Sequence, residues 1–349
     1  VTREIFTRQP KLLHVVDLSE NNLVELVRSL RSTAGYFDGE FQTFCLDSGS
    51  REFDALMEAS LGYDYVLNLS ALKHVRSERD PFTLMRLLKT NIFNTLSSLQ
   101  WAKRNNVRKY FTVSTDKAAN PANLMGASKR IMEIILMQES QEICVSTARF
   151  ANVAFSDGSL LDGFNKRFLK HQPITAPKDI KRFFFTEREA GVLCLMSTIL
   201  GLNREIFFPK ENIEMHLTSF TDIAFNFIQD KGFTPHICES ESEARNKAHD
   251  LISNNKWPLY FFNTDTTGEK NFEEFYTITE KLDMDRYNSI GIIKTDLIDN
   301  YLQIEKFIET YEEILNSRVW KKEKIVDAMK IVIPDLNHVE LGKNLDEKM

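Results

Sequence analysis

Over its first 200 or so residues the chain alternates short apolar runs with longer amphipathic stretches, and few folds accommodate this pattern. The expected strands lie at residues 12–17, 41–46, 65–69, 109–113 and 143–149. Between them, apolar residues recur at helical spacing, which predicts helices at residues 19–30, 51–59, 80–104 and about 126–139. Strands that alternate with helices predict a parallel sheet covered by helices, which is a doubly wound, Rossmann-like α/β fold.

The first strand of such a sheet is not evident in this sequence. In dinucleotide-binding folds, a Gly-rich turn joins the first strand to the first helix and binds the diphosphate. The chain has only 13 glycines in 349 residues and no GxxGxxG motif, and residues 2–9 already have helical character. Either the sequence starts inside a longer chain, or the phosphate site is built without this turn. We favour the first interpretation, because residues 12–17 look like a second strand.

Composition excludes several classes of function. Lys and Arg number 44 against 50 Asp and Glu, which gives a net charge of −6 without any basic block and argues against a nucleic-acid partner. No apolar run approaches the ~20 residues that a membrane-spanning helix needs. The four cysteines match no zinc or disulfide spacing. We therefore expect a cytoplasmic protein that binds no metal, no nucleic acid and no membrane.

The regular alternation weakens after about residue 200, and this change suggests three parts. Residues 1–150 are expected to form an NAD-binding Rossmann domain that is incomplete at its amino-terminal end. Residues 151–204 are expected to form a smaller substrate-binding region, partly interleaved with the first domain. Residues 205–349 are expected to form a carboxyl-terminal α/β extension of unknown role.

Two acidic residues follow expected strands. Asp17 ends the second strand, where an acid accepts hydrogen bonds from the adenosine ribose of NAD and repels the 2′-phosphate of NADP. Capping of the next helix is an equally supported role for Asp17. Asp47 follows the third strand and is placed for the adenine edge, although taken alone it is better interpreted as a turn residue.

The segment 114–129 (STDKAANPANLMGASK) places polar side chains at the end of a strand and a lysine on the helix that follows. Thr115, Asp116 and Lys117 offer a hydroxyl, an acid and an amine where doubly wound folds bind their ligands. Met125 precedes Lys129 by four residues, so both side chains face the same side of the helix. Exposed Asp–Lys pairs are common on surfaces, so this pair indicates chemistry only in this context.

These motifs resemble the nucleotide-sugar 4,6-dehydratases of the extended short-chain dehydrogenase/reductase superfamily, in the polysaccharide-biosynthesis branch that acts on UDP-N-acetylglucosamine. The matching pieces are residues 17–23 (DLSENNL), 71–75 (ALKHV), 89–91 (KTN), 113–121 (VSTDKAANP), 125–130 (MGASKR), 149–153 (RFANV), 174–175 (IT) and 182–184 (RFF). They follow the order of that family over roughly half of the chain. Met125 stands where most of these enzymes have Tyr, as in the Met-x-x-x-Lys subgroup that retains configuration at C5 of the sugar.

The resemblance implies a reaction and a role for each matching residue. The reaction is NAD-dependent oxidation at C4, loss of water across C5–C6 and return of hydride to C6. The implied catalytic residues are Thr115, which orients the C4 hydroxyl, Asp116 as the acid, Lys117 as the base, Lys129 behind Thr115, and Met125 at the Tyr-equivalent position. The implied cofactor-binding residues are Asp17, Ser19, Asn21, Asp47, Ser48, Ala71, Asn91, Ser114, Lys129 and Val153.

The implied partners are a UDP-sugar substrate and further copies of the chain in a homo-oligomer. The implied substrate-binding residues are Lys73, His74, Asn152 and Arg182. Arg182 would bind a diphosphate oxygen, because guanidinium suits phosphate bidentately. The plain alternative for Arg182 is a surface cation without a ligand.

Two other functions are compatible with the sequence. An NAD-dependent sugar-nucleotide epimerase shares the fold and the ketone step, but it needs no acid–base pair for elimination across C5–C6. A catalytically silent member of the family would act as a scaffold. Met125 and the missing glycine turn favour the scaffold, whereas Thr115, Asp116, Lys117 and Lys129 argue against it.

Overall fold

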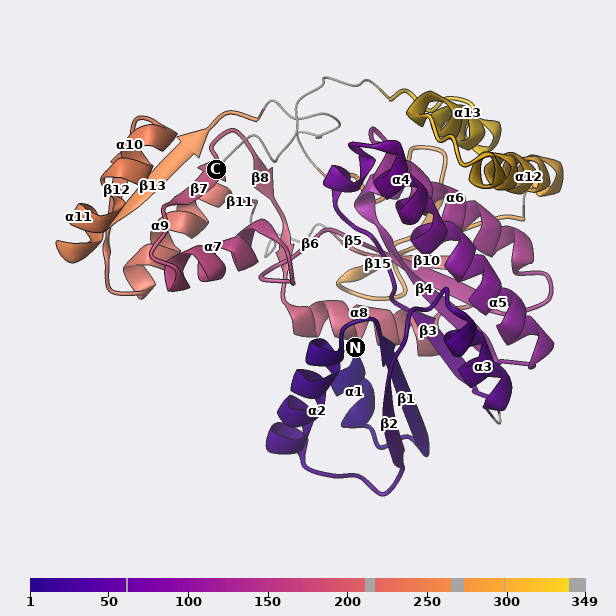
Figure 1. The fold of residues 1–349 in the computed structure, drawn as a ribbon. Coiled ribbons are helices and arrows are strands. Elements are labelled where there is room, and N and C mark those ends of the chain that lie inside the picture. The colour runs from indigo at the N-terminus through magenta and orange to yellow at the C-terminus, as the bar shows by residue number, and fades with distance from the viewer. Residues whose placement is uncertain (61, 211–216, 265–272, 298, 339–349) are drawn as a thin grey trace. The chain divides into compact units, whose positions relative to one another are not determined.

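The computed structural model describes residues 1–60, 62–210, 217–264, 273–297 and 299–338, and it divides into two compact units. Unit 1 consists of Val1–Phe150, Arg188–Lys210 and Glu274–His338 (Figure 1). Unit 2 consists of Ala151–Glu187, Glu211–Glu273 and the tail Val339–Met349, which lies outside the described residues. No helix in the described ranges is long and apolar enough to cross a membrane.

A six-stranded sheet in the order β14-β15-β10-β5-β4-β3 forms the centre of unit 1. Its strands are β3 (Tyr65–Asn68), β4 (Lys109–Thr115), β5 (Val145–Phe150), β10 (Glu205–Pro209), β14 (Lys281–Asp283) and β15 (Ile290–Lys294). β3, β4, β5 and β10 run parallel, whereas β15 pairs antiparallel with both β10 and β14. The expected doubly wound α/β class is confirmed, with an antiparallel edge that the extension supplies.

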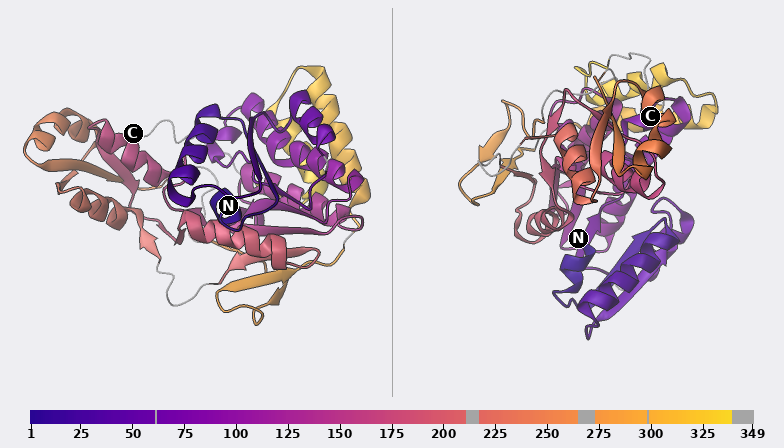
Figure 2. Two further views of the ribbon diagram at one scale, coloured as in Figure 1. Left: turned by 90° about the horizontal axis from the view of Figure 1, so that it is seen from below. Right: turned by 90° about the vertical axis from the view of Figure 1, so that its left-hand side faces the viewer.

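A second, two-stranded parallel sheet in unit 1 consists of β1 (Leu12–Asp17) and β2 (Glu40–Cys45). Helices α1 (Thr2–Phe6) and α2 (Glu20–Ala34) cover it, and Figure 2 shows α2 lying along the strand pair. Phe6, Leu13 and Leu30 form the small core between these elements. Within the described part of the chain, β1 pairs only with β2, and β3 only with β4. β1 and β3 are therefore edge strands of two separate parallel arrangements, each paired on one side among the described residues.

Helices α3 (Arg51–Ala59), α4 (Pro81–Leu88), α5 (Asn94–Arg104), α6 (Leu124–Glu139) and α8 (Glu187–Leu200) complete the α/β alternation. The long helix expected at residues 80–104 begins as predicted, because Asp80 caps it and Pro81 occupies its first turn. It is interrupted, however, by one π-helical turn, η2 (Lys89–Phe93). This turn carries Asn91, whose side chain bonds the backbone N–H and C=O of Leu72 at 2.9 and 3.1 Å. Single π turns inside α-helices are frequent at functional sites.

The last two helices, α12 (Tyr301–Ser317) and α13 (Lys322–Val332), belong to the core of unit 1. Their buried residues pack with α4 and α6 in one hydrophobic cluster, which contains Leu84, Leu88, Met125, Ile131, Phe307, Tyr311, Ile325 and Met329 among others. The rings of Phe93 and Tyr311 stack with their centroids 3.8 Å apart. Figure 1 shows this helical pair in yellow beside α4 and α6.

Unit 2 is built on a three-stranded parallel sheet in the order β12-β13-β7. Its strands are β7 (Ile174–Pro177), β12 (Thr234–Cys238) and β13 (Lys256–Phe262), and its helices are α7 (Leu160–Leu169), α9 (Phe220–Asp230), α10 (Glu241–Asn246) and α11 (Ala248–Ser253). Two short pairs are also present: β6 (Asn152–Val153) with β9 (Phe184–Phe185), and β8 (Lys181–Arg182) with β11 (Thr218–Ser219). Trp257, Phe164 and Ile174 are fully buried at its centre.

The compact units divide the chain after Phe150 and again further along. Residues 188–210 return to unit 1, because β10 pairs with β5. Residues 274–338 also join unit 1, because β15 pairs with β10 and the last two helices pack on α4 and α6. The expected extension at 205–349 is therefore shared between both units.

Candidate active site

The carboxyl end of β4 holds a hydrogen-bonded cluster of three consecutive residues. β4 ends at Thr115 and is followed by a single 3₁₀ turn, η3 (Asp116–Ala118). Thr115 Oγ1 donates to Asp116 Oδ1 at 2.7 Å, and Lys117 Nζ donates to the same oxygen at 3.3 Å. Asp116 is 4% exposed, so this pair is not an ordinary solvated surface pair.

Lys129 reaches the same strand from α6. Its Nζ donates to the carbonyl oxygen of Val113 at 3.0 Å, two residues before Thr115. Burial lowers the pKa of the Lys129 ammonium from its ordinary 10.5 to about 8, against the opposing effect of the Glu133 carboxylate. An amine with such a pKa can hold or release a proton close to neutral pH.

The first turn of α6 lies against this cluster because Gly126 has no side chain. A Cβ at position 126 would lie 2.5 Å from the carbonyl oxygen of Lys117, far closer than van der Waals contact allows. Asn123 caps the helix by accepting from the Gly126 N–H at 2.8 Å. The Met125 N–H donates to the buried carboxylate of Glu78 at 2.6 Å. Glu78 belongs to η1 (Val75–Glu78), so it ties this turn to the segment that follows β3.

The side chain of Met125 lies in the hydrophobic cluster shared by α4, α6, α12 and α13 and is 4% exposed. A thioether cannot exchange a proton, and its surroundings here are apolar. The structure therefore favours the interpretation that Met125 packs the core.

The predicted adenosine-binding residues lie at the ends of β1 and β2. Asp17 is exposed, and its Oδ1 accepts from the Ser19 N–H at 2.7 Å in the turn that precedes α2. Ser19 caps α2, and Asn21 is exposed in the first turn of that helix. Asp47 Oδ1 accepts from a backbone N–H in its own turn, that of Gly49, at 3.0 Å.

The remaining predicted cofactor residues of unit 1 are Ser48, Ala71, Asn91 and Ser114. Ser48 Oγ accepts from Asn94 Nδ2 at 3.3 Å. Asn91 is fully buried and also donates to Ser128 Oγ at 2.9 Å, which joins η2 to α6. Ser114 Oγ donates to Glu133 Oε1 at 2.6 Å. Ala71 follows β3 and is partly exposed.

The predicted substrate residues are divided between the units. Lys73 and His74 belong to unit 1 and are exposed between β3 and η1. Asn152 and Arg182 belong to unit 2, as does Val153 in β6. Arg182 is 8% exposed, so the alternative of a plain surface cation does not describe it.

A buried carboxylate that the sequence reasoning missed organises these residues in unit 2. Glu273 accepts from Asn152 Nδ2 and, at 3.0 Å, from the backbone N–H of Phe183. Its Oε1 lies 3.9 Å from Arg182 Nε. Glu273 lies in the expected extension, residues 205–349, where none of the family motifs was found. The residues around it in the sequence form no pattern that would have indicated its role.

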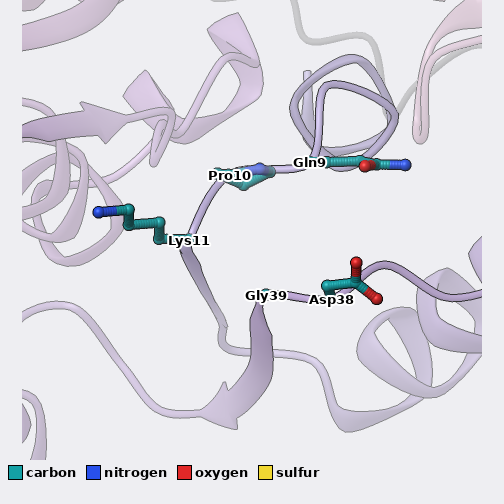
Figure 3. Close-up of a pocket in the computed structure, with 5 residues that line it drawn as sticks. All are labelled: Gln9, Pro10, Lys11, Asp38 and Gly39. Carbon is teal, nitrogen blue, oxygen red and sulfur yellow. The ribbon is translucent and has the colours of Figure 1, made fainter.

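A pocket of about 250 Å³ opens at the amino ends of β1 and β2 and is lined by Gln9, Pro10, Lys11, Asp38 and Gly39 (Figure 3). The Lys11 side chain points away from Gln9 and Asp38 in this view. Ligands of doubly wound folds bind at the carboxyl ends of the strands, so this pocket is separate from the candidate active site.

Solved structures with the same fold define the class. Pen from Bacillus thuringiensis matches with a TM-score of 0.65 and 21% identity, covering 91% of this chain and 93% of that one. The dTDP-glucose 4,6-dehydratase DesIV from Streptomyces venezuelae, solved with NAD, matches with a TM-score of 0.57 and 15% identity over 78% of this chain and 82% of that one. The UDP-glucuronic acid 4-epimerase from Bacillus cereus, also solved with NAD, matches with a TM-score of 0.57 and 16% identity. The match covers 80% of this chain and 86% of the epimerase. The chain thus has the fold of nucleotide-sugar dehydratases and epimerases.

The chain belongs to the family described as polysaccharide biosynthesis protein, which matches residues 1–295. The expected membership of the polysaccharide-biosynthesis branch is therefore confirmed, independently of any substrate. An uncharacterized membrane protein of Methanocaldococcus jannaschii is 33% identical over 217 residues, covering 60% of this chain and 62% of the relative. The probable polysaccharide biosynthesis protein EpsC of Bacillus subtilis is 29% identical over 238 residues, which cover 67% of this chain and 39% of EpsC. The UDP-N-acetylglucosamine 4,6-dehydratase (inverting) of Campylobacter jejuni is 32% identical over 170 residues, which cover 46% of this chain and 49% of the dehydratase. The chain thus spans less than two thirds of the length of these relatives.

Proposed function

We propose that this protein is an NAD-dependent nucleotide-sugar 4,6-dehydratase that acts on UDP-N-acetylglucosamine with retention at C5. The observation that carries the proposal is the cluster at the end of β4, where Thr115 and Lys117 both donate to one oxygen of Asp116. Water elimination across C5–C6 needs a base for the C5 proton and an acid for the C6 hydroxyl, and a Lys–Asp pair supplies both. The dehydratase of Campylobacter jejuni among the relatives supports the choice of substrate.

The residues divide the proton transfers among them. Lys117 is the base that takes the proton from C5, and Asp116 is the acid that gives a proton to the departing C6 hydroxyl. Thr115 orients the C4 hydroxyl through its own hydroxyl group. Lys129, with a pKa of about 8, is suited to take up the proton that the C4 hydroxyl loses. Bound NAD would supply the hydride acceptor for C4 and the hydride donor for C6.

The described residues fit NAD at its two ends. The exposed carboxylate of Asp17 at the end of β1 suits the adenosine ribose and disfavours a 2′-phosphate. Lys129, which lies on α6 and donates to the Val113 carbonyl of β4, is proposed for the nicotinamide ribose. For the diphosphate, we propose a further parallel strand with a Gly-rich turn between β1 and β3, because within the described residues each of these strands pairs on one side only.

Lys73, His74, Asn152 and Arg182 are proposed to bind the UDP-sugar. In unit 2, the Glu273 carboxylate lies beside Arg182, with Oε1 3.9 Å from Nε, and the planar guanidinium is the kind of group that binds a diphosphate. The four cysteines are free thiols, which fits the proposed cytoplasmic location. Assembly into a homo-oligomer remains a prediction.

A sugar-nucleotide 4-epimerase is the second candidate. Several relatives bear that name, among them the UDP-glucose 4-epimerase of Rickettsia rickettsii, which is 31% identical over 182 residues and covers 50% of this chain and 53% of its own. An epimerase would use the C4 oxidation and leave the Lys117–Asp116 pair without a role.

The test is to incubate the natural full-length protein with UDP-N-acetylglucosamine and NAD in D₂O and to follow the sugar by NMR. A 4-keto-6-deoxy product with deuterium at C5 supports the dehydratase, because the C5 proton is removed and replaced from solvent. A C4 epimer without ring deuterium supports the epimerase instead. Unchanged substrate would contradict both and favour a silent scaffold.

A further inference from the structure

Arg149, at the end of β5, is a fully enclosed cation whose register partner in β4 is Ser114. Its Nε and Nη2 donate to Glu133 at 2.9 and 2.8 Å, and its Nη1 and Nη2 donate to Glu280 at 2.9 and 2.8 Å. Nη1 also donates to the Phe275 carbonyl at 2.8 Å. A guanidinium has five N–H donors, so these five bonds use all of them. Arg149 therefore holds the protein together and has no donor left for a ligand.

Glu133 connects this cation to the candidate active site. It lies on α6 one turn after Lys129, and it accepts from Ser114 Oγ at 2.6 Å, directly before Thr115. Burial alone would raise the pKa of Glu133, but the charge and hydrogen bonds of Arg149 lower it to about 2. Glu133 is therefore a permanent negative charge beside Lys129, and that charge favours the protonated form of the lysine.

Glu280 comes from the part of the chain to which the sequence gave no role. Its Oε2 also accepts from the Thr277 N–H at 2.8 Å, so its own turn orients the carboxylate. Arg130 completes the group, with Nη1 at 3.1 Å from Glu133 and 3.6 Å from Glu280. The charges of Glu133 and Glu280 balance those of Arg130 and Arg149. Removal of the Glu280 charge therefore leaves this group with one excess positive charge.

We propose that Glu133 and Glu280 are positioning residues, and that the ion-pair chain Glu280–Arg149–Glu133 orients the end of β4 and sets the charge state of Lys129. The segment from Glu274 to Glu280 thereby completes the candidate site of unit 1. The turnover part of this inference rests on the proposed function, whereas the electrostatic part does not. Charged groups on the described elements packed around Lys129 include Glu133 and Arg130 on α6, Asp116 and Lys117 after β4, and Arg149 on β5. Glu280 joins them through Arg149, and the buried Glu78 of η1 contacts the first turn of α6.

Two substitutions test the electrostatic part with opposite signs. Glu280→Gln removes a negative charge, so the pKa of Lys129 should fall. Arg130→Gln removes a positive charge from a side chain that is 32% exposed, so the pKa of Lys129 should rise. A purely structural contact would not give opposite shifts. Asp285→Asn, on the exposed turn between β14 and β15, is the matched control and should leave the titration unchanged.

The Lys129 titration is followed by NMR of protein carrying ¹³C-labelled lysine, with the resonance assigned from its loss in Lys129→Met. In the turnover assay, Glu280→Gln should lower kcat about tenfold or more with little change in KM for the sugar nucleotide. Glu280→Asp, which keeps the charge, should recover part of this loss.

A folded Glu280→Gln protein with the wild-type Lys129 titration would overturn the proposal, and so would shifts of the same sign in both variants. If Glu280→Gln does not fold, the Arg130→Gln protein provides the test. A wild-type Lys129 titration in that protein would also overturn the proposal. If the wild-type protein does not convert UDP-N-acetylglucosamine, the proposed function fails, while the Lys129 titrations still decide the positioning role.

Discussion

Burial of the Lys129 ammonium has a cost in folding free energy that depends on pH. The side chain is 3% exposed, and burial lowers its pKa from 10.5 to about 8. At 1.36 kcal/mol per pKa unit, this shift corresponds to about 3 kcal/mol. The folded protein carries this full penalty below about pH 8, where the lysine is protonated in both the folded and the unfolded chain.

Between about pH 8 and pH 10.5, the unfolded chain keeps a proton that folded Lys129 has released, so the penalty disappears as pH rises. Lys129→Met carries no ammonium and should not show this change. The free energy of unfolding of the wild type, relative to Lys129→Met, should therefore rise by about 3 kcal/mol from pH 7 to pH 10.5. The lost hydrogen bond to Val113 adds an offset that does not depend on pH.

The assay is urea denaturation of both proteins at several pH values across this range. Lys103→Met is the control. Burial alone would lower the pKa of Lys103, but its hydrogen bonds to Glu139 and Glu142 raise it overall. Its stabilising contribution is present throughout the range, so Lys103→Met should be destabilised by a nearly constant amount. Parallel stability curves for the wild type and Lys129→Met would refute the reasoning.

Four further predictions follow from the same structure. Lys117→Ala should abolish deuterium incorporation at C5 under the NMR assay, and near-normal product formation would show that Lys117 is not the base. Thr115→Val should lower kcat by about 10²-fold. Met125→Leu should cost under about 1.5 kcal/mol of stability and leave kcat largely intact. An equal loss of kcat in both variants would show that the Met125 thioether has a role in the reaction. Phe307→Ala in α12 should cost about 3–5 kcal/mol in urea denaturation, because its side chain is fully buried against α4 and α6, and a loss below about 1 kcal/mol would mean that α12 is not part of the core. Calorimetric NAD affinity should rise when an upstream strand with a Gly-rich turn is joined to residues 1–349, and unchanged affinity would contradict the proposed diphosphate site.

Local patterns were sufficient to predict most elements of unit 1. The strand at residues 12–17 and the helix at 51–59 have the expected bounds, because apolar periodicity and Ser caps are properties of adjacent residues. Asp80 and Pro81 likewise marked a helix start. The π turn at Lys89–Phe93 escaped prediction, because it accompanies a bond from Asn91 to the backbone of Leu72 in another segment.

The sequence by itself determined the fold class and the cluster of Thr115, Asp116 and Lys117, since three consecutive residues at a strand end remain together in any packing of the chain. Only the tertiary structure decided how this cluster is supported. Arg149 meets Glu280 across 131 positions, and Asn152 meets Glu273 across 121. Met125 is a core residue because distant helices cover it. Partners so far apart are selected by strand order and helix packing, and a local pattern carries no information about either.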